Sequence, residues 1–169
     1  ASWRIFLFFF AYGTLLWFYS HKLSKIVLIR ELTASFLTVL AFFSLTIYFK
    51  TLPLSFFLYG MNLFFVFFAR EIYKDIIWLK GDVIQGYESI ATKAGLETSR
   101  RIFQVILISS IIVDGVFLWV HTKPELFYVL GSIAVLKTIM LILIAHNVKP
   151  IHRLLQLAIL LFIVGIAWL

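Results

Sequence analysis

A dense group of charged residues interrupts an otherwise apolar chain between residues 70 and 89. The stretch reads REIYKDIIWLKGDVIQGYES and carries seven charged residues of both signs, whereas charged residues make up only 14% of the whole chain. If it is helical, a rotation of about 100° per residue places Glu71, Asp75, Trp78 and Asp82 on one face. Carboxylates stacked in this way repel one another and need a compensating cation. A divalent ion such as Mg²⁺, which takes oxygen ligands, would supply it.

A solvated helix just outside a membrane is the simpler alternative for the same pattern. Lys74 would then balance Glu71 and Asp75 through pairs along the helix. Mixed charge of this kind is common beside a membrane surface. Gly81 and Gly86, which follow, favour a turn or a close backbone approach beside an acid. Spacing alone leaves both interpretations open.

The composition places this charged stretch in a membrane protein. Hydrophobic residues make up 63% of the 169 residues, and the mean hydropathy is +1.04. A soluble domain of this length would need more polar surface to cover its core. In lipid the backbone must satisfy its own hydrogen bonds, which favours helices. The chain has no cysteine, which excludes disulfides and thiolate metal sites. In this composition we attribute the net charge of +7 to membrane anchoring and expect no nucleic-acid partner.

Six apolar segments approach the length of about 20 residues that a helix needs to cross a bilayer. They cover residues 3–20, 32–50, 54–73, 102–121, 125–145 and 151–169. Pro53, Pro124 and Pro150 stand where helices could begin. The sequence therefore predicts an all-α, polytopic transmembrane bundle of about six spans. It forms a single domain over residues 1–169, in which the loop 70–101 carries the charged motif.

Basic residues fall mainly on one side of this predicted bundle. Eleven of them lie in the loops near residues 20–31, 70–101 and 146–153, whereas Arg4 and two lysines lie on the other side. Cytoplasmic loops of membrane proteins carry an excess of Lys and Arg. We therefore expect an integral, multi-pass membrane protein whose charged motif faces the cytoplasm.

The charged stretch resembles the second aspartate-rich motif of the UbiA superfamily of intramembrane prenyltransferases. The residues that match this motif in register are Arg70, Glu71, Lys74, Asp75, Gly81, Asp82 and Gly86. The segment WFYSHKLSK at residues 17–25 is similar to the family's segment of tyrosine and lysine at the end of an earlier span. The segment AGLETSRRI at residues 94–102 is similar to its link into the next span. The resemblance covers most of residues 12–105.

The resemblance implies a fold, a reaction and a set of site residues. The fold is a bundle of nine helices around a central cavity, of which this chain would supply the later six, the C-terminal two-thirds of a longer domain. The reaction is the Mg²⁺-assisted transfer of an isoprenoid group from its diphosphate to a lipid, quinone-precursor or similar aromatic acceptor, among membrane lipids. The implied site residues are Asp75, Asp82 and Lys74 for catalysis, Asp75, Asp82 and Glu71 for the metal, and Tyr19, Lys22, Lys25 and Arg70 for the diphosphate.

Several positions depart from the family pattern. Trp78 stands where the family usually has its middle aspartate, Glu31 stands where an asparagine is frequent, and residues 89–91 read Ser-Ile-Ala in place of Thr-Leu-Pro. The first aspartate-rich motif is absent, since residues 1–69 contain no aspartate. Two acids on one helix do not easily hold the two metal ions that a diphosphate needs. The missing ligands would come from an earlier part of a longer protein or from a second chain, unless the activity has been lost.

Asp114 and Lys137 lie inside two of the predicted spans. Ionisable residues within a membrane indicate a function by default, but a mutual ion pair across two helices explains both more simply. Two alternatives to the prenyltransferase therefore remain. One is a catalytically inactive UbiA-like subunit or scaffold. The other is a small transporter, which would require these two residues to line a water-filled path instead of facing each other.

Overall fold

The computed structural model describes residues 3–49, 53–120, 124–145 and 150–166, with the backbone alone for residues 45–49. Within these ranges the chain is helical and contains no strand, so the all-α prediction is confirmed. The elements are α1 (Trp3–His21), the 3₁₀ helix η1 (Leu23–Lys25), α2 (Ile29–Phe49), α3 (Leu54–Gln85), α4 (Ile90–Ala94), α5 (Leu96–Val120), α6 (Pro124–Ala145) and α7 (Ile151–Gly165).

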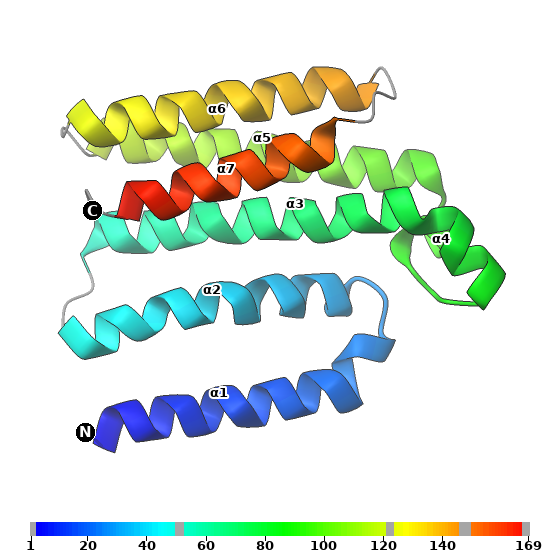
Figure 1. Cartoon of the computed structure of the whole chain (residues 1–169), viewed down its shortest axis with the longest axis horizontal. Helices are drawn as coiled ribbons and strands as arrows, with labels where there is room; N and C mark the ends of the chain where they lie inside the picture. Colours follow the sequence, from blue (N-terminus) through cyan, green and yellow to red (C-terminus); the bar gives the residue numbers. More distant parts are fainter. Residues whose placement is uncertain (1–2, 50–52, 121–123, 146–149, 167–169) are drawn as a thin grey trace.

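The long helices lie side by side and run in alternating directions, with α1 at one edge of an elongated bundle (Figure 1). Helix α3 is central and packs against α2, α4, α5 and α7. Helix α6 packs against α5 and α7. Because of the alternation, the end of α3, helix α4 and the turn from α1 to α2 meet at the same end of the bundle (Figure 1).

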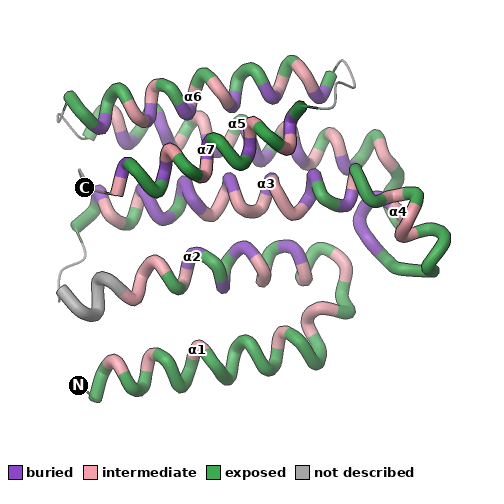
Figure 2. The backbone as a smooth tube through the Cα atoms, viewed as in Figure 1, coloured by how far each residue is buried: buried purple, intermediate pink, exposed green. Residues whose placement is uncertain are grey.

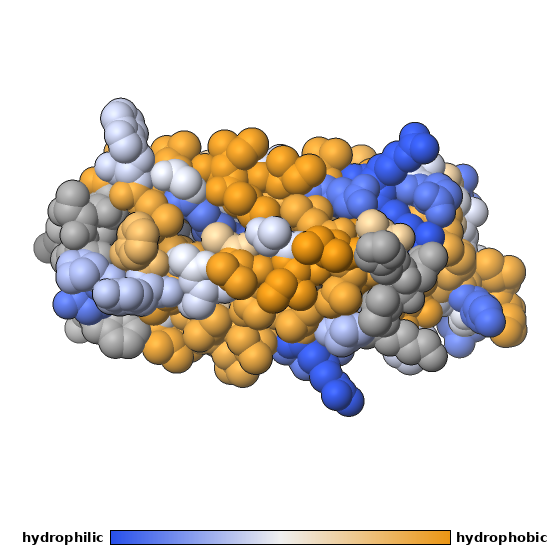
Figure 3. Space-filling model, turned by 90° about the horizontal axis from the view of Figure 1, so that it is seen from above, coloured by the Kyte–Doolittle hydropathy of each residue, from blue (hydrophilic) through white to orange (hydrophobic). Residues whose placement is uncertain are grey.

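Three of the described helices, α3, α5 and α6, are long and apolar enough to cross a membrane, and α7 is apolar but shorter. Figure 3 shows apolar side chains over most of the middle of one face, while strongly hydrophilic side chains gather mainly toward one end. This arrangement is the one expected of a helical membrane protein. The count of six spans and the cytoplasmic orientation remain predictions.

The buried core lies mainly along the helices from α3 onward, Leu37 and Val39 of α2 add to it, and α1 contributes nothing. Tyr59, Phe103 and Leu130 are fully buried, whereas α1 has no buried residue. Figure 2 shows the same contrast, with α1 mostly exposed and buried positions following α3 and α5. Phe6 and Phe10 of α1 are more than half exposed. A continuous apolar surface of this kind fits lipid or another protein surface and not water.

Helix α3 is too long to lie wholly within a membrane. Its 32 residues span about 48 Å at 1.5 Å per residue, against roughly 30 Å for a hydrocarbon core. Its last three turns therefore extend beyond the predicted span of residues 54–73. The segment 70–101, which the sequence predicts as a loop, does connect two apolar helices but is itself mostly helical. The charged motif is consequently presented on a rigid helix.

Gly86 ends this helix in the left-handed conformation, with φ of 65°. The amide of the next residue, Tyr87, donates to the carbonyl of Asp82 at 2.8 Å, which closes the last turn. The predicted turn is therefore present at Gly86, whereas Gly81, the glycine next to Asp82, lies within helix α3. Left-handed backbone is accessible to glycine at low cost, and it caps many helices in this way.

Replacing Gly86 with alanine should lower the free energy of unfolding by about 1 kcal/mol, because an L-residue is strained at this φ. An added Cβ would meet no atom within 4 Å, so the cost is conformational alone. Gly13→Ala is the matched control, because it also lies in open space but within a helix, and it should be neutral or slightly stabilising. Chemical unfolding in detergent measures both; equal effects of the two substitutions would contradict the prediction.

Candidate functional site

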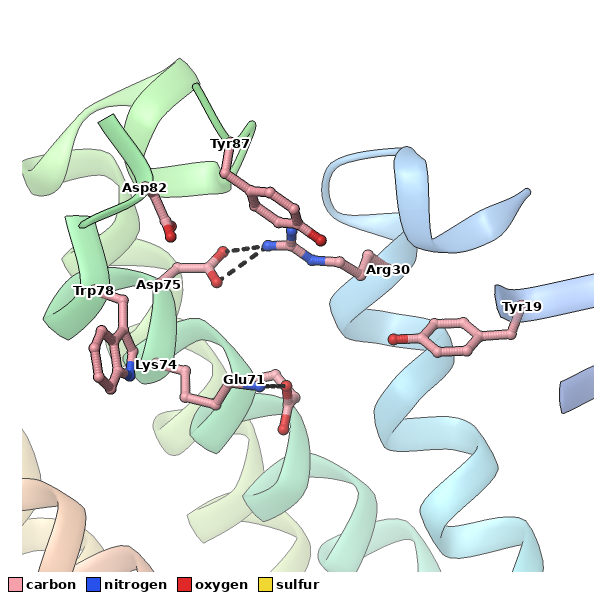
Figure 4. A pocket seen from close by; sticks show the side chains of 8 residues that line it. All are labelled: Tyr19, Arg30, Glu71, Lys74, Asp75, Trp78, Asp82 and Tyr87. Atoms are coloured by element: carbon pink, nitrogen blue, oxygen red, sulfur yellow. Dashed lines mark hydrogen bonds and ion pairs between the residues drawn. The ribbon is translucent and has the colours of Figure 1, made fainter. Parts of the chain in front are cut away.

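A cavity of about 290 Å³ lies at the end of the bundle where α3 passes beyond its predicted span (Figure 4). Its lining residues are Tyr19 of α1, Arg30 of α2, Glu71, Lys74, Asp75, Trp78 and Asp82 of α3, and Tyr87 after α3. We refer to it as the acidic cavity, since three of its five charged residues are carboxylates. Residues from both ends of a 69-residue stretch of sequence meet there because α1, α2 and α3 alternate in direction.

Helix α3 positions the acids. Glu71, Asp75, Trp78 and Asp82 follow one another at intervals of four, three and four residues along an uninterrupted helix, which keeps them on one face. All four line the acidic cavity, so the predicted common face is confirmed. Trp78 is 64% exposed and lies on the side of α3 away from Arg30 in Figure 4. It therefore forms part of the rim.

The Asp75 carboxylate is already partnered. Arg30 Nη2 donates to its two oxygens at 3.1 and 3.2 Å, and the backbone N–H of Ile90 donates to Oδ2 at 3.2 Å. Arg30 also forms an ion pair with the neighbouring Glu31. Its guanidinium lies 5.2 Å from the ring centroid of Tyr87, within range of a cation–π contact. Asp75 thus ties α2, α3 and the start of α4 together.

Burial raises the pKa of the Asp75 carboxyl to about 6. The nearby Glu31 carboxylate also raises this pKa, whereas the Arg30 guanidinium and the hydrogen bond from the Ile90 amide lower it. Asp75 follows the segment predicted to cross the membrane and is 7% exposed. Desolvation disfavours the charged form of a buried carboxyl, which explains the direction.

The remaining two acids differ in their partners. Glu71 accepts from Lys74 Nζ at 2.7 Å, and Arg70 lies 3.5 Å from its other oxygen. The Asp82 carboxylate makes no hydrogen bond or ion pair with any residue in the described ranges. The cavity therefore keeps one unpaired carboxylate at its partly exposed end.

Three of the four residues predicted to bind the diphosphate, Lys22, Lys25 and Arg70, do not line the acidic cavity. Lys22 Nζ lies over the Phe18 ring at 5.8 Å from its centroid. Lys25 lines a neighbouring shallow pocket beside Glu88, and Arg70 lines a surface hollow with Gln156. Of the predicted diphosphate contacts, only Tyr19 lines the acidic cavity.

Arg30 and Tyr87 are cavity residues that sequence reasoning missed. In the sequence, Arg30 is recognised only as one of the eleven basic residues on the predicted cytoplasmic side. Its position beside Glu31, just before the predicted span of residues 32–50, was the available signal, because a charged residue at the edge of an apolar segment needs a partner where it becomes buried. Tyr87 carries no signal of its own beyond the turn at Gly86.

The acids as arranged do not fit the predicted magnesium ion. Among the described residues, no three His, Asp or Glu side chains converge on a point where they could hold a metal. Both oxygens of Asp75 accept from Arg30, and Glu71 is held by Lys74. Magnesium requires near-octahedral oxygen ligands at about 2.1 Å, which one free carboxylate does not supply.

The fold and the cavity define a helical protein with several membrane-length helices and a polar, arginine-bridged cavity at one end of the bundle. Comparison of the chain with protein-family models, with curated proteins and with solved structures finds no match. The resemblance to the UbiA superfamily therefore rests on the residues of the charged stretch and its neighbours.

A second polar cluster lies in the middle of the bundle. Lys137 Nζ donates to Asp114 Oδ2 at 2.6 Å and to Asn62 Oδ1 at 2.7 Å. Ser110 Oγ also donates to Asn62 Oδ1 at 2.7 Å, and the Asn62 amide donates to Asp114. All four side chains belong to residues that are at most 1% exposed. The predicted ion pair is confirmed, because the side chains of Lys137 and Asp114 face each other across α6 and α5.

Proposed function

We propose that this chain is part of a membrane prenyltransferase of UbiA type, with six spans and with the acidic cavity as the diphosphate end of its site on the cytoplasmic side. The observation that carries the proposal is the cavity. Residues of the charged stretch meet Tyr19 at one end of an apolar bundle, where a molecule with a charged head and an apolar tail would lie.

The cavity offers groups suited to a diphosphate. Lys74 and the Arg30 guanidinium are cations, and the Tyr19 hydroxyl can donate a hydrogen bond. In the proposed reaction the bond between the allylic carbon and the diphosphate oxygen breaks, and the diphosphate leaves with the electron pair. The acceptor then forms a bond to the allylic cation and releases a proton. The chain's contribution is to bind and neutralise the leaving group and to exclude water from the cation.

One acidic motif is only half of what the family uses. A second set of diphosphate ligands is therefore part of the proposal, and a second chain could supply it. Helix α1, with its exposed Phe6, Phe10 and Trp17, offers an apolar surface next to the cavity residue Tyr19 for such a contact.

Replacing Lys74 with alanine should weaken binding of farnesyl diphosphate by tenfold or more, because the variant loses a charge-assisted contact worth about 1.5–3 kcal/mol. Binding is measured on the full chain in nanodiscs. Lys80→Ala, an exposed lysine of the same helix that does not line the cavity, is the matched control and should bind as the wild type does. Farnesol as a competitor separates recognition of the head from that of the tail. Equal affinity of wild type and Lys74→Ala, or no binding by the wild type, would reject the proposal.

A non-catalytic membrane subunit or scaffold is the second candidate. Two observations support it: Arg30 occupies both oxygens of Asp75, and Trp78 replaces an acid of the family pattern. Such a protein would keep its fold and show no saturable binding of an isoprenoid diphosphate.

A further inference from the structure

We propose that Arg30 is the resident cation of the acidic cavity and that the cavity takes up no divalent metal ion while Arg30 is in place. The inference depends on the position of Arg30 and holds for either candidate function, prenyl transfer or scaffold.

Arg30 is fixed from several directions. Its Nη2 contacts Glu31 and both oxygens of Asp75, and its Nη1 donates to the Glu88 carbonyl at 3.3 Å. The Tyr87 ring covers the guanidinium at 5.2 Å from its centroid. The side chain is only 14% exposed. Figure 4 shows the guanidinium between the Tyr87 ring and the Asp75 carboxylate. The charge is therefore held in one place by groups from α2, α3 and the segment after α3.

The surrounding carboxylates depend on this charge. Glu31 is 1% exposed, and within the described part of the chain Arg30 is the only cation with which it forms an ion pair. Asp75 is also buried, and Asp82 lines the same cavity without a partner. A buried carboxylate is costly unless it is paired. Glu31 and Asp75 therefore share Arg30 as their counter-charge.

Arg30 occupies the position that a metal ion would need. A divalent ion close to Asp75 and Glu31 would have to displace the guanidinium from the same oxygens and would be repelled by it. Without Arg30, the Glu31 and Asp75 carboxylates, which both contact its Nη2, would lack a counter-charge beside the unpaired Asp82 of the same cavity. Carboxylate oxygens are ligands of the type that Mg²⁺ and Mn²⁺ accept. Removing the guanidinium should therefore convert the cavity into a divalent-cation site.

The test is Mn²⁺ binding to the full chain in detergent, followed by electron paramagnetic resonance of the free ion. We expect no saturable binding to the wild type below millimolar Mn²⁺ and at least tenfold tighter binding to Arg30→Gln. The gain should disappear in Arg30→Gln/Asp75→Asn. Arg101→Gln, an exposed arginine at the start of α5, is the matched control and should behave as the wild type does. Tight binding to the wild type, or a folded Arg30→Gln protein without any gain, would overturn the proposal.

Thermal unfolding with and without Mg²⁺ is an independent readout. Arg30→Gln leaves two buried carboxylates unpaired, so its Tm should fall and should recover in part when Mg²⁺ is added, whereas the Tm of the wild type should not change. If Arg30→Gln does not fold, Arg30→Gln/Glu31→Gln removes both charges of one pair and should still bind Mn²⁺ more tightly than the wild type. Failure of that gain also overturns the proposal. Absence of farnesyl diphosphate binding would reject prenyl transfer and leave these results standing.

Discussion

Replacing Lys137 with alanine should lower the free energy of unfolding by about 3–5 kcal/mol, because it leaves the buried Asp114 carboxylate without its counter-charge. Asn62 would lose the same partner, since Lys137 Nζ donates to both residues. A loss of this size is a large part of the stability of an ordinary domain. Unfolding in detergent, followed by far-UV circular dichroism, measures it.

Two variants decide whether this loss comes from the unpaired charge. Lys137→Met/Asp114→Asn removes both charges and keeps an acceptor for the Asn62 amide, so it should recover at least half of the loss. Lys80→Ala, on the exposed surface of α3, should change stability by less than about 0.5 kcal/mol. A Lys137→Ala protein as stable as the wild type would show that the pair is not structural, and the transporter relay would again be the better explanation.

The main helices could be predicted from the sequence because each contains a continuous apolar segment, and three of them also have a proline at the start. Pro53 and Pro150 directly precede α3 and α7, and Pro124 is the first residue of α6, as predicted. The common face of the charged stretch could also be predicted, since it depends only on the rotation per residue within one helix. Both are local properties of the chain.

Contacts between helices could not be predicted in the same way. Arg30 and Asp75 are 45 residues apart, and nothing in the spacing says that the start of α2 lies beside the end of α3. The same applies to Asn62, which joins the ion pair of α5 and α6 from α3. A sequence indicates that a charge near a membrane needs a partner, but the partner's identity depends on helix packing.

Helix α4 begins within the segment 89–91 that departs from the family pattern. Ser89, which stands where the family has threonine, is the N-cap of α4. Its side chain accepts from the Thr92 amide, and the Thr92 hydroxyl accepts from the Ser89 amide at 2.8 Å. This capping box holds the Ile90 amide in position to donate to Asp75. The Ser89 cap and the Ile90 amide therefore support the Asp75 carboxylate, a role that threonine and leucine at these positions could also fill.

The stability advantage of the wild type over Asp75→Asn should increase as the pH falls from 7 to 4. The Asp75 carboxyl has a pKa of about 6 in the folded chain, above its ordinary value of 3.8. Above pH 6 it is ionised in both states, whereas between pH 6 and 4 the folded chain takes up a proton that the unfolded chain does not. Proton binding by the folded state raises the free energy of unfolding as the pH falls.

The expected size of this change follows from the same pKa values. A difference of about two pH units between the folded and unfolded states corresponds to roughly 3 kcal/mol. Denaturant unfolding of wild type and Asp75→Asn at each pH measures the difference between the two proteins, in which other titrating groups cancel to a first approximation. A difference that stays constant would mean that the effects of Arg30 and of burial on the Asp75 carboxylate cancel. A difference that shrinks toward pH 4 would mean that Arg30 stabilises the carboxylate more than burial destabilises it. The ion pair would then be a net contributor to stability at neutral pH, and Asp75→Asn would be the less stable protein there by a margin that acid removes.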